Sequence, residues 1–327
     1  MSCFETELKS NNDNMYKELF IKHEHNPILT AKDWHYPINT VFNPGAISYK
    51  GKTLLLVRVE DRRGFSHLTK AVSENGIDNW IIDESPTFAS SPDYPAERWG
   101  VEDPRITYVD ELEQFVIIYT SYSVSGPTVS MAMTNDFCSF VRFGTIMPPE
   151  DKDAALFPRQ FNKKWMLIHR PIEHGEHIWI SSSDNLKYWG DHKILIDSRE
   201  GCWWDGAKVG LSAPPMETPE GWLILYHGVK LTASGAIYRV GLALLDLENP
   251  TIVKRRSDEW IFGPKEPYEK YGDVQDVVFP CGWILDEQTR KVRMYYGGAD
   301  SCVALATANI DDMISYILSC PDPRNKR

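Results

Sequence analysis

The sequence lacks several features that would each have placed it in a class of protein. It contains no window of about 18 apolar residues, so no transmembrane helix is predicted. The formal net charge is −11, which argues against a nucleic-acid partner because such a partner requires a basic face. The N-terminus is polar and acidic and has no apolar stretch typical of a secretion signal. A cytoplasmic protein is therefore expected.

Cysteine pairs and common catalytic motifs are also scarce. The six cysteines are scattered, without a C-x-x-C pair or histidines at metal-ligand spacing, so we expect free thiols and no metal site. The chain has no nucleophile elbow, P-loop or dinucleotide fingerprint, and no cofactor is expected. It also has no long Pro/Gly/Ser linker. We therefore predict one catalytic domain over residues 1–327, with residues 1–35 as an N-terminal extension.

What the sequence does contain is a repeated unit, in which a short strand and a turn precede an apolar strand that leads into polar residues. Five such second strands are predicted at Thr53–Asp61, Phe115–Ser123, Trp165–Ile172, Trp222–Val229 and Val292–Asp300. Repeats at roughly 50 to 70 residues indicate a solenoid or a propeller. We predict an all-β fold, a single five-bladed β-propeller with an axial active site, in preference to a β-sandwich or a parallel β-helix.

Prolines and helical periodicity add detail to this fold. A proline-containing segment precedes each second strand, and because proline has no N–H to donate, these segments are interpreted as the starts of the innermost strands. Helical periodicity is weak except at Asn309–Ser319, which predicts a C-terminal helix. A short helix over Asn14–His23 is also predicted within the extension.

The segment Trp99–Arg105 carries the sharpest local signal, two adjacent carboxylates before a proline and an arginine. Successive strand residues point to opposite sides, so only one of Glu102 and Asp103 is expected to face the axis. A carboxyl group buried there could act as a general acid. The competing interpretation is a turn at a strand start, in which Asp103 caps backbone N–H groups and Arg105 pairs with Glu102.

Several basic residues follow or interrupt apolar runs, where a charge is costly unless it is paired. They are Arg58, Arg62, Arg63, Arg159, Arg170, Lys208 and His227. If they converge on the axis, they form a cation cluster suited to phosphate or another oxyanion. Pairing with acidic neighbours is favoured for Arg62 and Arg63, whereas the anion site is favoured for Arg170, Lys208 and His227.

Ten short motifs, in this order, resemble glycoside hydrolase family 130, the β-mannoside phosphorylases and their hydrolytic relatives. The resemblance extends from about residue 25 to the C-terminus and rests on FNPGAI at Phe42, RVED at Arg58, WGVEDPR at Trp99, ALFPR at Ala155, HRP at His169, AKVG at Ala207, PEGWLILYHGV at Pro219, DLENP at Asp246, GDVQDVVFPCG at Gly272 and YYGGAD at Tyr295.

The resemblance implies a five-bladed propeller and an inverting reaction. Inorganic phosphate attacks C1 of a terminal β-mannosyl residue and gives α-mannose 1-phosphate. Asp103 is implied as the general acid, acting through the 3-hydroxyl of the mannose. The phosphate is implied to bind Arg159, Arg170, Lys208 and His227, and the mannoside to bind Asn43, Arg58, Glu102, Tyr238 and Asp300. Hydrolases of the family lose parts of this basic set, so phosphorolysis is expected, with phosphate as co-substrate.

The linkage and the acceptor sugar stay open. The first expectation is a β-1,4-mannoside, including mannosyl-N-acetylglucosamine or a manno-oligosaccharide. The alternatives are a β-1,2-manno-oligosaccharide phosphorylase, a hydrolytic β-mannosidase and, last, a non-catalytic mannan-binding propeller. The expected partners are the mannoside and phosphate, without nucleic acid or membrane, and a homo-oligomer is left open. A contact of Arg62 or Arg63 with the anion is also left open.

Overall fold

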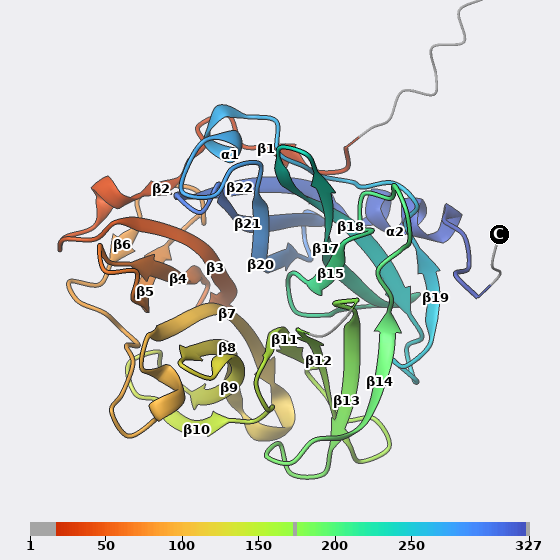
Figure 1. The fold of residues 1–327 in the computed structure, drawn as a ribbon, viewed down its shortest axis with the longest axis horizontal. Coiled ribbons are helices and arrows are strands. Elements are labelled where there is room, and N and C mark those ends of the chain that lie inside the picture. The colour runs from red at the N-terminus through yellow and green to blue at the C-terminus, as the bar shows by residue number, and fades with distance from the viewer. Residues whose placement is uncertain (1–17, 173–174, 325–327) are drawn as a thin grey trace, which may run out of the picture.

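The computed structural model describes residues 18–172 and 175–324, which form an all-β fold with few helices (Figure 1). In this part of the chain the strands form four sheets. The largest contains β3 (Thr40–Tyr49), β4 (Lys52–Glu60), β5 (Ser66–Ser73), β6 (Ile81–Ile82), β7 (Gly100–Val109), β8 (Gln114–Ser123), β9 (Gly126–Thr134) and β10 (Val141–Thr145). It joins two antiparallel units through a single parallel pair, Ser66 with Gly100.

The other three sheets each hold one antiparallel unit. The second sheet contains β11 (Asp151–Leu156), β12 (Trp165–Pro171), β13 (Ile178–Ser183) and β14 (Gly190–Ile196). The third contains β15 (Lys208–Leu211), β16 (Met216–Thr218), β17 (Gly221–Thr232), β18 (Gly235–Leu245) and β19 (Val253–Arg256). The fourth contains β1 (Ile21–Lys22), β2 (Leu29–Thr30), β20 (Val278–Asp286), β21 (Lys291–Gly298) and β22 (Cys302–Asn309).

The five predicted second strands are confirmed as β4, β8, β12, β17 and β21. Each pairs antiparallel with the strand before it in its unit, and those preceding strands, β3, β7, β11, β15 and β20, lie around the centre of the molecule in Figure 1. The five-bladed propeller stays a prediction, because two units share one sheet and no sheet of the described residues closes on itself.

The prolines of the inner strands lie differently from the prediction. Pro44, Pro104 and Pro280 lie inside β3, β7 and β20, at places where the strand register shifts, rather than at strand starts. A β-bulge leaves a backbone N–H out of the ladder, so a proline is tolerated there. Pro158 and Pro214 follow β11 and β15 and belong to no strand.

Helices are short and lie at the edges of the fold. The C-terminal helix is confirmed as α2 (Ile310–Ser319), whose first turn is capped by the Asn309 side chain. A second helix, α1 (Pro267–Lys270), and three 3-10 turns at Ala31–Asp33, Pro95–Glu97 and Asp110–Leu112 complete the described helices. The predicted helix over Asn14–His23 is wrong in its described part, where Ile21–Lys22 form β1, while residues 14–17 lie outside the described residues.

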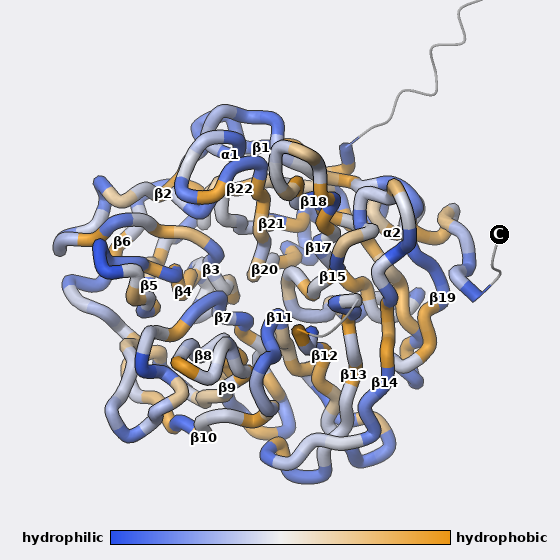
Figure 2. Tube along the Cα trace, in the orientation of Figure 1, coloured by the Kyte–Doolittle hydropathy of each residue, from blue (hydrophilic) through white to orange (hydrophobic). Residues whose placement is uncertain are grey.

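The core consists of apolar side chains between neighbouring sheets, and Figure 2 shows hydrophobic residues along the strands. In one cluster, Ile168 and Ile180 of the second sheet pack with Trp222 and Ile224 of the third. Such burial is the main favourable contribution to folding. Cys138, Cys202, Cys281, Cys302 and Cys320 are free thiols, and Cys3 lies outside the described residues. No helix in the described ranges is long and apolar enough to cross a membrane.

Candidate active site

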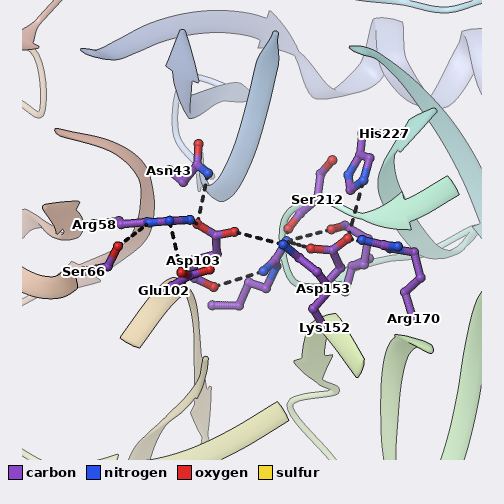
Figure 3. Close-up of polar contacts among 12 residues, drawn as sticks. Asn43, Arg58, Ser66, Glu102, Asp103, Lys152, Asp153, Arg170, Ser212 and His227 are labelled. Atoms are coloured by element: carbon purple, nitrogen blue, oxygen red, sulfur yellow. Dashed lines mark hydrogen bonds and ion pairs between the residues drawn. The ribbon is translucent and has the colours of Figure 1, made fainter. Parts of the chain in front are cut away.

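An open pocket of about 330 Å³ lies where β7, β11, β12 and β15 approach one another. Its lining combines charged residues of both signs with three apolar or aromatic residues. The charged residues are Glu102, Lys152, Arg170, Glu176 and Lys208, and the other three are Tyr122, Pro127 and Ile172. Figure 3 shows the polar network behind it. A larger pocket, of about 630 Å³, is lined by Trp203, Trp204 and Trp260 among others, and contains none of the charged groups just named.

Three inner strands have a β-bulge that turns a polar side chain toward this network. Asn43, Asp103 and Asp153 have φ of 45°, 48° and 52°, and each lies at a register shift of its strand. Asn and Asp tolerate this left-handed conformation better than most residues. The bulge corrects the prediction that only one of Glu102 and Asp103 faces the axis, because both contact Arg58.

Asp103 is a buried acceptor held by two donors. Its Oδ1 accepts hydrogen bonds from Asn43 Nδ2 and from Arg58 Nη1, both at 3.0 Å. Arg58 is oriented in turn by Ser66 Oγ, 3.0 Å from Nε, and by Glu102, 3.2 Å from Nη2. The alternative interpretation, a pair between Arg105 and Glu102, is wrong, because Arg105 donates to the Asp103, Leu211 and Ser212 carbonyls instead.

The carboxyl groups of this network differ in their affinity for protons. Burial opposes the ionised form of Asp103, but Arg58, Lys152 and Arg105 hold its pKa below the usual range. For Glu102, burial is the largest effect and raises the pKa, against the attraction of Arg58. Burial likewise raises the pKa of Asp300 to about 6, although Arg58 opposes this. The protein without ligand therefore favours an ionised Asp103 beside carboxyl groups that retain a proton more readily.

Asp153 is the centre of a second buried cluster. Its Oδ2 accepts from Arg170 Nε at 2.8 Å and lies 3.5 Å from His227 Nε2, while Oδ1 lies 3.5 Å from Arg105 Nη2. Burial would raise the pKa of Asp153, but the charges of Arg170, Lys152 and Arg105 hold it well below the usual range. A carboxylate in this position fixes the orientation of the arginine side chains around it.

His227 is neutral in this environment. Burial lowers the pKa of its ring to about 3, despite the attraction of Asp153, and the nearby Arg170 lowers it further. The ring lies 4.7 Å from that of Phe279 and 5.8 Å from that of Tyr238. Within the described residues neither ring nitrogen has a hydrogen-bond partner. Buried polar groups without a partner are rare in proteins, so these nitrogens are an unusual feature of the network.

Two lysines bring positive charge to the pocket. Lys152 Nζ lies 4.0 Å from Asp103 Oδ2, and although burial disfavours its charge, Asp153, Asp103 and Glu102 raise its pKa. Lys208 Nζ lies 4.0 Å from Glu176 Oε2 and 5.5 Å from the ring centroid of Tyr238. Both lysines are therefore charged groups next to the network of Asp103 and Asp153.

Most of the predicted site residues come together, with one exception among the cations. The contacts and pKa effects described above link nine of the predicted residues, namely Asn43, Arg58, Glu102, Asp103, Arg170, Lys208, His227, Tyr238 and Asp300. Arg159 instead pairs with Glu217, Glu248 and the Leu247 carbonyl, at 3.5, 3.7 and 3.0 Å. It follows the end of β11, whereas the pocket lies at the beginning of that strand, so its expected place in the anion site is not supported.

Arg63 pairs with Asp61 through Nη2 at 2.6 Å, as favoured from the sequence. Three residues of the network were not expected from the sequence, namely Lys152, Asp153 and Glu176. The first two belong to the charged triplet Asp151–Asp153 immediately before the run Ala154–Phe157. That triplet could have indicated them, because charges that open an apolar strand need partners. No group of residues suited to a metal ion occurs in the described ranges.

Comparison with known proteins gives consistent matches. A model of glycoside hydrolase family 130, described as beta-1,4-mannooligosaccharide phosphorylase, matches residues 21–318. The beta-1,4-mannooligosaccharide phosphorylase of Ruminococcus albus is 32% identical over 314 residues, which cover 93% of this chain and 92% of that protein. The 1,2-beta-oligomannan phosphorylase of Thermoanaerobacter sp. is 33% identical over 300 residues, covering 88% and 96%.

The fold also matches a solved structure, the beta-1,2-mannobiose phosphorylase of Listeria innocua in complex with beta-1,2-mannobiose. The TM-score is 0.83 at 30% sequence identity, and the superposition covers 91% of this chain and 99% of that one.

Proposed function

The chain belongs to glycoside hydrolase family 130, and on that premise we propose that it is a phosphorylase that cleaves a terminal β-mannosyl residue with inorganic phosphate. The observation that carries this proposal is the distance of 4.0 Å between Asp103 Oδ2 and Lys152 Nζ. It brings a buried carboxyl group next to the cations that line the pocket. A proton donor for a leaving group and a binding site for an anion are the two elements that phosphorolysis requires.

We propose that phosphate binds to Lys152, Arg170, Lys208 and His227. Phosphate near neutral pH carries roughly 1.5 to 2 negative charges and needs several charge-assisted donors. Lys152 takes the place that the sequence assigned to Arg159, since it lies at the pocket while Arg159 pairs elsewhere. The approach of phosphate also favours the imidazolium form of His227, because an adjacent negative charge raises a histidine pKa.

We assign the mannosyl residue to the part of the network around Asp103. Asn43 and Arg58 donate hydrogen bonds to Asp103. Burial raises the pKa of Asp300, and the charge of Asp103 adds to this rise. Glu102 lines the pocket. Tyr238, whose ring lies near His227 and Lys208, borders the acceptor sugar. Hydroxyl groups of a pyranose pair well with planar carboxylate, amide and guanidinium groups.

The reaction proceeds by inversion at C1. A phosphate oxygen forms the new bond to C1 as the bond from C1 to the glycosidic oxygen breaks. Asp103 gives its proton to the 3-hydroxyl of the mannose, which passes its own proton to the leaving oxygen. No second catalytic carboxylate is needed because phosphate is itself the nucleophile. Asp103 is left ionised and regains a proton before the next turnover.

The low pKa of Asp103 in the ligand-free protein is compatible with this role. Arg58, Lys152 and Arg105 lower that pKa, and bound phosphate offsets the positive charge of the same neighbourhood. The pKa of Asp103 therefore rises when phosphate binds, and the acid form becomes available in the complex in which it is needed.

We further propose that the five antiparallel units are the blades of one five-bladed propeller over a single domain, with the site on its axis. The arrangement of β3, β7, β11, β15 and β20 around the centre supports this (Figure 1). For the substrate, a β-1,4-mannoside is our first candidate, in line with the family model and the Ruminococcus relative. A β-1,2-mannoside is the second, in line with the Thermoanaerobacter and Listeria relatives.

The test is an incubation with β-1,4-mannobiose, β-1,2-mannobiose and mannosyl-N-acetylglucosamine, each with and without phosphate. We expect α-mannose 1-phosphate only when phosphate is present, and none from an Asp103→Asn variant that still binds the sugar. Release of mannose without phosphate would identify a hydrolase instead. Binding without any turnover would identify a mannan-binding protein.

A further inference from the structure

Glu176 places a carboxylate on two of the cations of the pocket. Its Oε2 forms an ion pair with Arg170 Nη1 and lies 4.0 Å from Lys208 Nζ. The Glu176 side chain is 28% exposed, whereas that of Asp153, the other partner of Arg170, is fully buried. Glu176 thus approaches these cations from the open side of the pocket, which is the side from which a ligand would enter.

The backbone holds Glu176 in this position. The Glu176 carbonyl accepts a hydrogen bond from the Val209 N–H at 3.1 Å, next to Lys208 on β15. Ser198 fixes the residues on either side, since its Oγ donates to the Gly175 carbonyl at 2.7 Å and its N–H donates to His177 Nδ1 at 2.9 Å. The fold therefore positions the carboxylate over the cations, and its side chain is partly exposed to solvent.

The balance of charge indicates what this carboxylate does. The buried acids have fixed partners, because Glu102 and Asp103 contact Arg58 while Asp153 contacts Arg170 and Arg105. With these pairs in place, Glu176 is the one further carboxylate of the described residues that pairs with Arg170, through Nη1, and with Lys208. A dianion entering the same space would be repelled by an ionised Glu176 and would need the same donors.

We propose that Glu176 occupies the phosphate position in the ligand-free protein and competes with phosphate for Arg170 and Lys208. This inference rests on the proposed function, because it concerns the anion of that reaction. Binding of phosphate then includes rotation of the Glu176 side chain away from the cations, with the backbone still held by Val209. The carboxylate keeps Arg170 and Lys208 paired while the site is empty, at a cost in affinity for phosphate.

The test is Glu176→Gln, which keeps the size of the side chain and removes its charge. We expect the KM for phosphate to fall by about two- to fivefold, the range for one partly exposed ion pair, with the KM for the mannoside unchanged. A rise in the KM for phosphate would overturn the proposal, because it would make Glu176 a group that assists the anion. An unchanged value would overturn it as well.

Glu217→Gln is the matched control, because it removes the same charge from a residue that pairs with Arg159 away from the pocket. An equal fall in both variants would show a general effect of net charge and overturn the proposal. Direct titration with inorganic phosphate, followed by calorimetry, provides a second readout. If the wild-type protein shows no phosphate-dependent turnover, the proposed function fails, while tighter phosphate binding by Glu176→Gln would still support competition at the cations.

Discussion

His227 and Gly210 lie next to each other on paired strands, at the point where Asp153 approaches the histidine ring. A β-carbon on Gly210 would lie 2.5 Å from Asp153 Oδ2 and 2.5 Å from His227 Cε1. The contact between the acid and the ring therefore depends on the absence of a side chain at position 210. Single atoms decide the geometry of this cluster, because a packed interior cannot absorb a methyl group without a shift.

Gly210→Ala is expected to raise the KM for phosphate and to lower the free energy of unfolding by about 1–3 kcal/mol, the usual cost of overpacking. Steady-state kinetics and urea unfolding measure the two effects. Gly190→Ala is the control, because a β-carbon there meets no atom within 4 Å. Similar behaviour of the two variants would show that the space beside His227 is not restricted.

The low pKa of His227 predicts a dependence of stability on pH. The pKa is about 3 in the folded protein and about 6.5 in an unfolded chain. Below pH 6.5 the unfolded chain binds a proton that the folded protein excludes, so stability falls as the pH falls from 6.5 to 3. The slope from this residue reaches about 1.4 kcal/mol per pH unit. His67, with a pKa near 4, adds an effect of the same sign.

Unfolding of wild type and His227→Asn in urea, measured at pH 7 and pH 5 without phosphate, tests this expectation. The variant should lose less stability than wild type between the two pH values. Parallel losses would mean that the ring is protonated in the folded protein. The difference is attributed to position 227 because His67 is unchanged in both proteins.

At the scale of the strand, β11 illustrates which structural features the sequence predicted and which it did not. The second strands could be located because long apolar runs between turn residues are typical of buried strands. The bulges could not, since alternation assumes a regular ladder, and a residue with positive φ at Asp103 or Asp153 breaks it. Lys152 was missed, and Arg159, which the family resemblance implied as a phosphate ligand, follows the other end of β11. The sequence of this segment does not show which end of the strand meets the site.

Lys152→Ala and Arg159→Ala are expected to differ. Loss of Lys152 should raise the KM for phosphate by about tenfold or more, since a hydrogen bond to a charged group contributes roughly 1.5–3 kcal/mol. Loss of Arg159 should leave that KM unchanged, because its partners are Glu217, Glu248 and the Leu247 carbonyl. Initial rates over a range of phosphate concentrations check both. A larger effect at position 159 would restore the assignment made from the sequence.

At the scale of the whole molecule, the two ends of the described chain meet in one sheet. Both β1 and β2 pair antiparallel with β22, and Ile21 lies opposite Thr307. Phe20 is 2% exposed and belongs to the same apolar cluster as Met313 and Ile317 of α2. The sequence predicted an extension up to residue 35, but its strands are integral to the fold from Ile21 onward. A short segment without clear periodicity gave no signal of this pairing.

Phe20→Ala is expected to lower the free energy of unfolding by about 3–5 kcal/mol, the cost of deleting a buried phenyl ring. Ile21→Ala is the control, since Ile21 is 73% exposed, and it should change stability by less than about 0.5 kcal/mol. Equilibrium unfolding in urea gives both values. If Phe20→Ala costs no more than Ile21→Ala, the burial of Phe20 contributes little to the stability of the fold.

The pairing of β1 and β2 with β22 has a consequence during synthesis. These two strands are translated before the other described strands, whereas the strand that pairs with them is translated after those others. Asn43 and Asp300, which we assign to the same sugar, are likewise translated far apart in time. A chain that ends before β22 thus leaves β1 and β2 unpaired and lacks part of β22's sheet, and enzymatic activity should require synthesis through β22.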